Sequence, residues 1–171
     1  MLVADRPHSW TLGPDWPNGG EIDVIEGANQ AAENRMSLHT AGYCTVTGSG
    51  ESGNSVTKKC FAYAADQPPN SGCVVQPSPN PPSYGKAFNG RQGGVYAMEW
   101  TPKGIRIWFF PRGSIPESIR AGRPHSAKFG APAAEFRGPC NIDSYLSNQK
   151  LVSQDPKAKT YDCHVKEIDC A

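Results

Sequence analysis

The chain has 171 residues, a formal net charge of +1 and 19% charged residues. This charge offers no electrostatic attraction to nucleic acid or to an anionic membrane, and no apolar run approaches the roughly 20 residues of a membrane-spanning helix. Glycine (18) and proline (16) are abundant, which favours short strands and many turns over long helices. We therefore expect one domain, residues 1–171, with no nucleic-acid or membrane partner.

Apolar and polar residues alternate along several short segments, as they do in half-buried strands. In chain order these segments are residues 19–27, 34–40, 93–100, 104–110 and 148–153. The link at residues 101–104, TPKG, has Pro second and Gly fourth, which predicts a β-hairpin. Residues 114–122 are expected to form a helical turn that begins near Pro116. The pattern predicts an all-β fold, a sandwich of antiparallel sheets.

Residues 48–86 are rich in Gly, Ser, Asn and Pro and are expected to form one long loop. A loop of this length in a compact domain is either functional or cross-linked, and Cys60 and Cys73 within it favour a cross-link. The chain has six cysteines and none forms a CxxC, which argues against a thiolate metal site. We expect up to three disulfides and an oxidising compartment, while the spacing leaves the pairing open.

Three carboxylates interrupt the first of these strands: Glu21, Asp23 and Glu26. Side chains alternate between faces of a strand, so Glu21 and Asp23 share a face. Glu26 joins that face only if a β-bulge adds one residue after Asp23. Two like charges about 4 Å apart repel by about 4 kcal/mol at an effective dielectric near 20, so acids clustered on one face indicate chemistry or a bound cation.

Retaining glycoside hydrolysis needs such a set of acids. One carboxylate attacks the anomeric carbon, and a nearby carboxylic acid protonates the leaving oxygen. The pattern alone leaves two other interpretations open. The acids form a solvated face, or they bind a hard cation such as Ca²⁺ together with loop carbonyls.

The residues around the acids resemble the fungal laminarinase-like branch of glycoside hydrolase family 16. The similarity covers roughly residues 11 to 153, and its motifs occur in the family's order: GPDWPNGGEIDVIEGAN, MSLHT, FNGRQGGVYAMEWTPKGIRIWFFPRGSIP and GRPHSAKFGAPAAEF. The acids lie in the family's G-E-x-D-x-x-E signature. The resemblance implies a β-jelly roll that cleaves β-1,3 or mixed β-1,3/1,4 glucans with retention and without metal or cofactor. It also implies that Glu21 is the nucleophile, Asp23 the assisting acid and Glu26 the general acid/base.

Three further residues are candidates for substrate binding. Trp16 precedes the acids and is suited to stack on a glucose ring, or it belongs to the core. The resemblance places His39 near the acids, where it would bond one of them, although a lone histidine often has a structural role. Glu99 interrupts an apolar strand and either lines the cleft or faces water.

Both ends depart from the family pattern. The family has several strands before the signature, which here begins at residue 21, and the tail DPKAKTYDCHVKEIDCA replaces a Cys-Gly-Asp-Trp-like ending. We therefore expect a sandwich that is incomplete at both ends. The opening MLVADRPHSW lacks the features of a signal peptide, but the cysteines and the resemblance favour a secreted or cell-wall-associated protein.

The sequence therefore predicts a monomeric endo-β-1,3(4)-glucanase that acts on β-glucan polysaccharides or oligosaccharides. Two alternatives remain. One is a non-catalytic β-glucan-binding remnant of such a domain, and the other is a cell-wall transglycosylase that uses the same acids.

Overall fold

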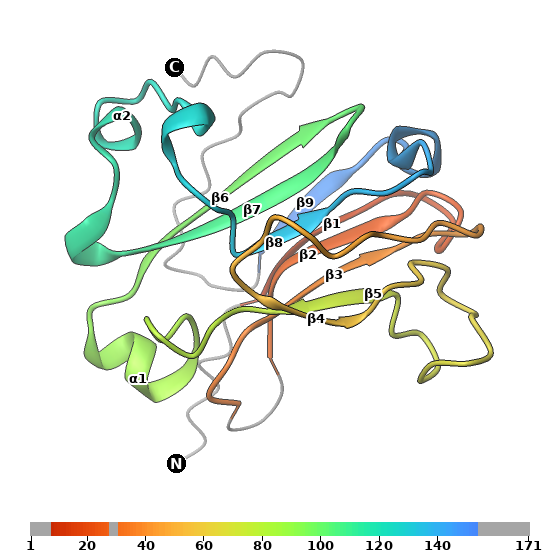
Figure 1. Ribbon diagram of the computed structural model, residues 1–171, viewed down its shortest axis with the longest axis horizontal. Coiled ribbons are helices and arrows are strands. Elements are labelled where there is room, and N and C mark those ends of the chain that lie inside the picture. Colours follow the sequence, from red (N-terminus) through yellow and green to blue (C-terminus); the bar gives the residue numbers. More distant parts are fainter. Residues whose placement is uncertain (1–7, 28–30, 154–171) are drawn as a thin grey trace.

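The computed structural model describes residues 8–27 and 31–153. In these ranges two antiparallel sheets face each other (Figure 1), with strand orders β4-β5-β3-β2-β1-β9 and β6-β7-β8. The larger sheet contains β1 (Ser9–Leu12), β2 (Glu21–Glu26), β3 (Arg35–His39), β4 (Asn54–Thr57), β5 (Cys73–Gln76) and β9 (Lys150–Ser153). The smaller sheet contains β6 (Gly94–Thr101), β7 (Gly104–Pro111) and β8 (Ala134–Phe136). The expectation of an all-β antiparallel sandwich is confirmed.

The helices are short and lie at the periphery of the sheets (Figure 1). They are α1 (Gly85–Gly90), α2 (Glu117–Arg120) and the 3₁₀ turns η1 (Arg112–Ser114), η2 (Ser126–Lys128) and η3 (Ile142–Tyr145). Within the described ranges, no helix has the length and apolar character needed to cross a membrane.

The five strands predicted from alternation are all present, as β2, β3, β6, β7 and β9. The hairpin is also present, because Thr101 pairs with Gly104 at the turn between β6 and β7. Helix α2 begins directly after Pro116, which confirms the predicted helical turn. These elements could be predicted because apolar and polar residues alternate along each of these strands.

The core lies between the two sheets and fixes which face of β2 carries the acids. Ile22 of β2, Leu38 of β3, and Ile105 and Ile107 of β7 are completely buried in one apolar cluster. Burying a side chain of this size contributes about 1.5–3 kcal/mol, so a one-residue slip of β2 would be very costly. The side chains that alternate with Ile22 therefore lie on the outer face of the larger sheet.

The expectation of one long loop at residues 48–86 is wrong in part, because β4 and β5 lie inside it. Strand β5 occupies an interior position between β3 and β4, and Cys73, Val74 and Val75 are all buried. A strand buried on both faces shows no alternation, and Gly- and Pro-rich flanks surround this one, so the sequence pattern gave no strand signal. Strands β1 and β8 were not predicted either, since each is only three or four residues long.

Two disulfides cross-link the described residues. Cys60 bonds to Cys73, which confirms the predicted cross-link of the Gly- and Ser-rich segment, and Cys44 bonds to Cys140. The remaining cysteines, 163 and 170, lie outside the described residues.

Candidate active site

The loop between β1 and β2 brings an aromatic side chain to the first acid. Gly13 N–H donates to the carbonyl of Gly20 at 2.9 Å and closes the loop. Gly20 has φ +70°, and a Cβ there would lie 2.5 Å from the carbonyl oxygen of Tyr145, so only glycine fits. Across this loop, the indole Nε1–H of Trp16 donates to Oε2 of Glu21 at 2.7 Å.

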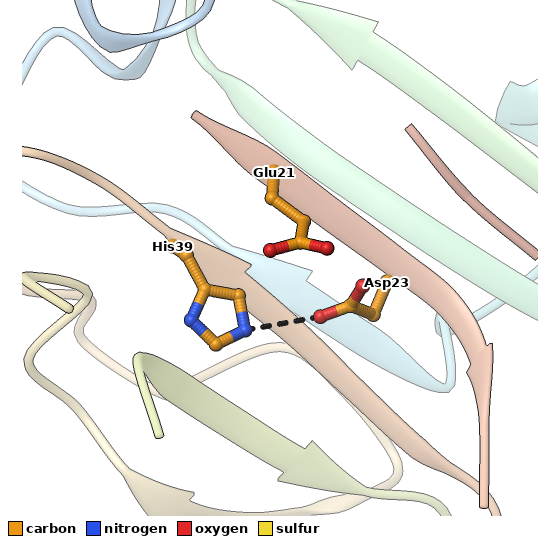
Figure 2. A group of neighbouring side chains, drawn as sticks. All are labelled: Glu21, Asp23 and His39. Atoms are coloured by element: carbon orange, nitrogen blue, oxygen red, sulfur yellow. Dashed lines mark hydrogen bonds and ion pairs between the residues drawn. The ribbon is translucent and has the colours of Figure 1, made fainter. Parts of the chain in front are cut away.

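The pairing of β2 with β3 assembles the first part of the site. Glu21 lies opposite His39, and Asp23 lies opposite Ser37. Figure 2 shows the two carboxylates and the imidazole pointing toward one another from these neighbouring strands. Asp23 Oδ2 lies 3.0 Å from His39 Nε2 and accepts a hydrogen bond from Ser37 Oγ at 2.5 Å. Asp23, His39 and Ser37 are all buried, so these bonds are shielded from water.

A β-bulge in β2 brings the third acid to the same face. Asp23 pairs with Ser37, and the next pair is Glu26 with Arg35, so three steps on β2 match two on β3. Ser37 and Arg35 are two residues apart on a regular strand and share a face, and cross-strand partners share a face as well. Glu26 therefore lies on the face of Asp23, which confirms the bulge predicted from the spacing of the acids.

A buried asparagine holds this bulge. The side chain of Asn34 is completely buried; its Nδ2 donates to the carbonyl of Val24 at 2.9 Å, and its Oδ1 accepts from the N–H of Glu26 at 2.9 Å. The side chain thus satisfies two backbone groups that the bulge removes from the ladder. Sequence reasoning missed both Asn34 and Ser37. The signal for Ser37 was available, since it lies two residues from His39 on one strand.

Burial and mutual repulsion raise the pKa of both glutamates. Burial raises the pKa of Glu21 and the Asp23 carboxylate raises it further, while His39 and the Trp16 hydrogen bond oppose the increase. Burial and Asp23 also raise the pKa of Glu26, and Arg35 opposes the increase. Such shifts toward neutral pH favour a carboxyl group that exchanges protons during a reaction.

His39 responds to two opposing effects. Burial lowers its pKa, but the hydrogen bond and charge of Asp23, together with Glu21 and Glu26, outweigh burial and raise the pKa above 6.5. Its other ring nitrogen, Nδ1, is buried and has no hydrogen-bond partner among the described residues. The positive form of His39 therefore depends on the acids that surround it.

One oxygen or nitrogen from each of Glu21, Asp23 and His39 lies within 4.8 Å of the others, a spacing that a metal ion could bridge. However, Asp23 Oδ2 is already bonded to His39 and Ser37, which leaves little of its bonding capacity for an ion. The arrangement favours proton sharing over cation binding, and we assign no metal here.

The structure does not bring Glu99 to the acids. Glu99 lies opposite Arg106 on the smaller sheet, accepts its Nε–H at 2.9 Å, and also accepts a hydrogen bond from Ser126. Arg106 lies between Ile105 and Ile107, which face the core, so Glu99 is on the outer face of the smaller sheet. The acids of β2 lie on the outer face of the opposite sheet, and we leave Glu99 out of the site.

Comparison with known proteins identifies the family of the chain. Residues 5–155 match a family model described as an XgeA-like, catalytic GH16 domain. The chain belongs to glycoside hydrolase family 16. Its sandwich is accordingly of the jelly-roll type.

Relatives with assigned names are similar over most of this chain. An endo-1,3(4)-beta-glucanase, xgeA of Emericella nidulans, is 45% identical over 152 residues, which are 88% of this chain and 23% of the relative. An endo-1,3(4)-beta-glucanase of Arthroderma benhamiae is 41% identical over 165 residues, which are 89% of this chain and 36% of the relative. The chain thus spans about a quarter to a third of these family 16 proteins.

Solved structures of the family superpose on most of the chain. An elongating family 16 beta-1,3-glucosyltransferase has a TM-score of 0.77 and 45% identity, and the match covers 86% of this chain and 48% of that one. Laminarinase 16A from Phanerochaete chrysosporium, solved with beta-glucans in donor and acceptor sites, has a TM-score of 0.77 and 36% identity. That match covers 86% of this chain and 51% of the laminarinase.

We predict that Asn34→Ala lowers the free energy of unfolding by about 2 kcal/mol or more, because each buried polar group left without a partner costs about 1–3 kcal/mol. Urea denaturation measures the change. Asn18→Ala is the matched control, since the Asn18 side chain is exposed and bonds only to Asp15. A loss in Asn34→Ala no larger than in the control would show that the asparagine does not hold the bulge.

Stability is expected to fall as pH rises from 6.5 into the alkaline range. The pKa of His39 is raised in the folded state, so its stabilising contribution is complete below 6.5 and is lost as pH rises through the raised value. The free energy of unfolding, measured by urea titration at several pH values, should decline less steeply in His39→Asn. His125→Asn, which alters an exposed histidine, should keep the wild-type decline. A flat or rising wild-type profile above pH 6.5 would contradict the assignment.

Proposed function

We propose that this chain hydrolyses internal β-1,3 or mixed β-1,3/1,4 bonds of glucans by a retaining double displacement. The observation that carries the proposal is the bulge in β2, which puts Glu26 on the same face as Glu21 and Asp23. Family membership and the names of the relatives support the substrate class.

The surroundings of each acid support a division of roles. Glu21 accepts a hydrogen bond from the indole of Trp16, which favours its ionised form and suits a nucleophile. Partial burial of the Glu26 carboxyl group and the charge of Asp23 raise its pKa, although much of the residue stays open to solvent. These properties suit a group that protonates the leaving oxygen and then activates water. Asp23 lies between them, bonded to His39 and Ser37, and helps to raise the pKa of both glutamates.

The roles of Trp16 and His39 in substrate binding belong to this proposal. Both side chains border Glu21, so a sugar at the nucleophile would contact them. We further propose that residues 1–171 belong to one catalytic domain, that the protein acts as a monomer, and that it works outside the cell or at the cell wall. The two disulfides of the described residues favour an oxidising environment.

Glu21→Gln and Glu26→Gln should each reduce the release of reducing ends from laminarin by about 10²–10⁴-fold, as expected when a proton-transfer or nucleophilic group is lost. Glu117→Gln, at an exposed position of α2, is the matched control and should keep wild-type activity. Equal, background release by wild type and both variants would overturn hydrolysis by this chain, and retained binding of laminarin without any change in the glucan would then favour the non-catalytic β-glucan-binding alternative.

Azide then separates the two roles. With an activated aryl β-glucoside donor, azide should replace the missing carboxylate in Glu21→Ala and give the α-glycosyl azide. In Glu26→Ala the covalent intermediate still forms, so azide should give the β-glycosyl azide. The opposite pairing of variants and products would exchange the two assignments.

Transglycosylation is the second candidate, because a 45% identical solved structure is an elongating glucosyltransferase. Both reactions share the glycosyl-enzyme intermediate and differ in whether water or a sugar hydroxyl accepts the glycosyl unit. Mass analysis of products from one laminari-oligosaccharide decides between them. We expect shorter products and new reducing ends; products longer than the starting oligosaccharide, without net reducing ends, would favour the transferase.

A further inference from the structure

A continuous row of aromatic rings leads away from the proposed nucleophile. It consists of Trp16, Tyr63, Phe61 and Tyr43, which we call the aromatic row. The ring centroids lie 6.0 Å apart from Trp16 to Tyr63, 5.8 Å from Tyr63 to Phe61 and 4.9 Å from Phe61 to Tyr43. The row therefore begins at the side chain that bonds Glu21 and ends several ring lengths away.

Two rings of the row are unusually exposed for aromatic side chains. Tyr43 is 84% exposed and Tyr63 is 57% exposed. Neither hydroxyl forms a hydrogen bond within the part of the chain that the structure describes, so both remain available to a ligand. Apolar side chains that gather on a surface beside a site indicate a binding surface, whereas isolated ones do not.

The backbone beneath the row is cross-linked and hydrogen-bonded to the strand that carries His39. Phe61 forms a parallel bridge with Thr40, the residue after His39, and the N–H of Ala62 donates to the carbonyl of Thr40 at 3.0 Å. Cys60 and Ala62 are buried, so the residue between them points outward. The disulfide of Cys60 and that of Cys44 anchor the two segments that carry the row. The exposed rings thus keep a fixed position relative to the acids.

A shallow hollow of about 260 Å³ lies beside Tyr63. Residues of the segment 62–70 line it, and Tyr63, Gln67 and Asn70 are among them. An aromatic face beside amide groups is the combination that a sugar ring, with one apolar face and a rim of hydroxyls, can use.

We propose that the aromatic row is a binding subsite for sugar units of a β-glucan chain remote from the bond that is cleaved. This inference rests on the proposed function, because the occupant is identified by continuity with Trp16 and Glu21. The steps between ring centroids, 4.9 to 6.0 Å, are close to the length of one pyranose unit, which suits successive sugar units of a polymer. Binding energy from such remote units contributes to the transition state, so the row should favour long substrates.

The first test compares substrates of different length. In Tyr43→Ala and Tyr63→Ala, the ratio of kcat/KM for a long laminari-oligosaccharide to that for a short one should fall about tenfold, equivalent to about 1.4 kcal/mol. Tyr43→Phe and Tyr63→Phe keep the ring and should retain most of the ratio. Val56→Ala alters another exposed apolar side chain, 54% exposed on β4, and should leave the ratio unchanged. An unchanged ratio in both alanine variants would overturn the subsite.

A second test does not depend on turnover. In a Glu21→Gln background, calorimetric titration with the long oligosaccharide should show about tenfold weaker binding when Tyr43 or Tyr63 is replaced by alanine. If the wild-type chain does not hydrolyse glucan but binding still depends on the row, the proposed activity fails and the subsite stands. If hydrolysis occurs, but neither glucan binding nor the ratio of kcat/KM for long and short oligosaccharides depends on the row, the proposed subsite is wrong and the proposed activity is retained. No glucan binding by the Glu21→Gln chain would also overturn the subsite.

Discussion

One additional residue in β2 determines how the acids are arranged. Between Asp23 and Glu26 the strand has a bulge, so the consecutive residues Val24 and Ile25 both pack toward the core. Without it, the core would hold Ile22 and Val24 in place and Glu26 would face the same apolar layer. A bulge costs ladder hydrogen bonds, and Asn34 replaces them from a completely buried position. The geometry of the site therefore depends on a side chain that bonds the backbone of β2 at the bulge.

The electrostatics follow from that geometry. Once three acids share a face, burial and Asp23 push the pKa of both glutamates upward. The two glutamates differ in their partners: Glu21 accepts the indole N–H of Trp16, whereas Glu26 is exposed opposite Arg35. The fold thus gives two residues of the same type different surroundings. A pair of acids needs such a difference for one to act as nucleophile and the other as proton donor.

The sequence predicted the features that depend on local alternation. Parity along β2 was sufficient to predict the bulge, because the core positions Ile22 and Val24 leave no other way for Glu26 to join Asp23. Features that depend on tertiary contact were missed. Strand β5 is buried on both faces and therefore shows no alternation of apolar and polar residues. Glu99 was assigned to the wrong surface because the pattern of a single strand does not say whether it belongs to the sheet that carries the acids or to the opposite sheet. Asn34 stabilises the bulge by a hydrogen bond to the backbone of β2, and its place in the sequence, just before β3, did not indicate that contact.

The same limit applies to the segments that carry the aromatic row. From composition, residues 48–86 appear as an unstructured, cross-linked loop, and Tyr63 as one aromatic residue within it. In the fold, the Cys60–Cys73 disulfide and the bridge between Thr40 and Phe61 hold this segment against the His39 end of β3. Exposed aromatic surface is costly, at roughly 25 cal/mol for each Å² of apolar area left in water, and a flexible loop would fold such rings inward. Because the backbone is cross-linked on both sides, the rings are held outward beside the acids, and the cross-links that stabilise the fold also determine the shape of the surface next to the site.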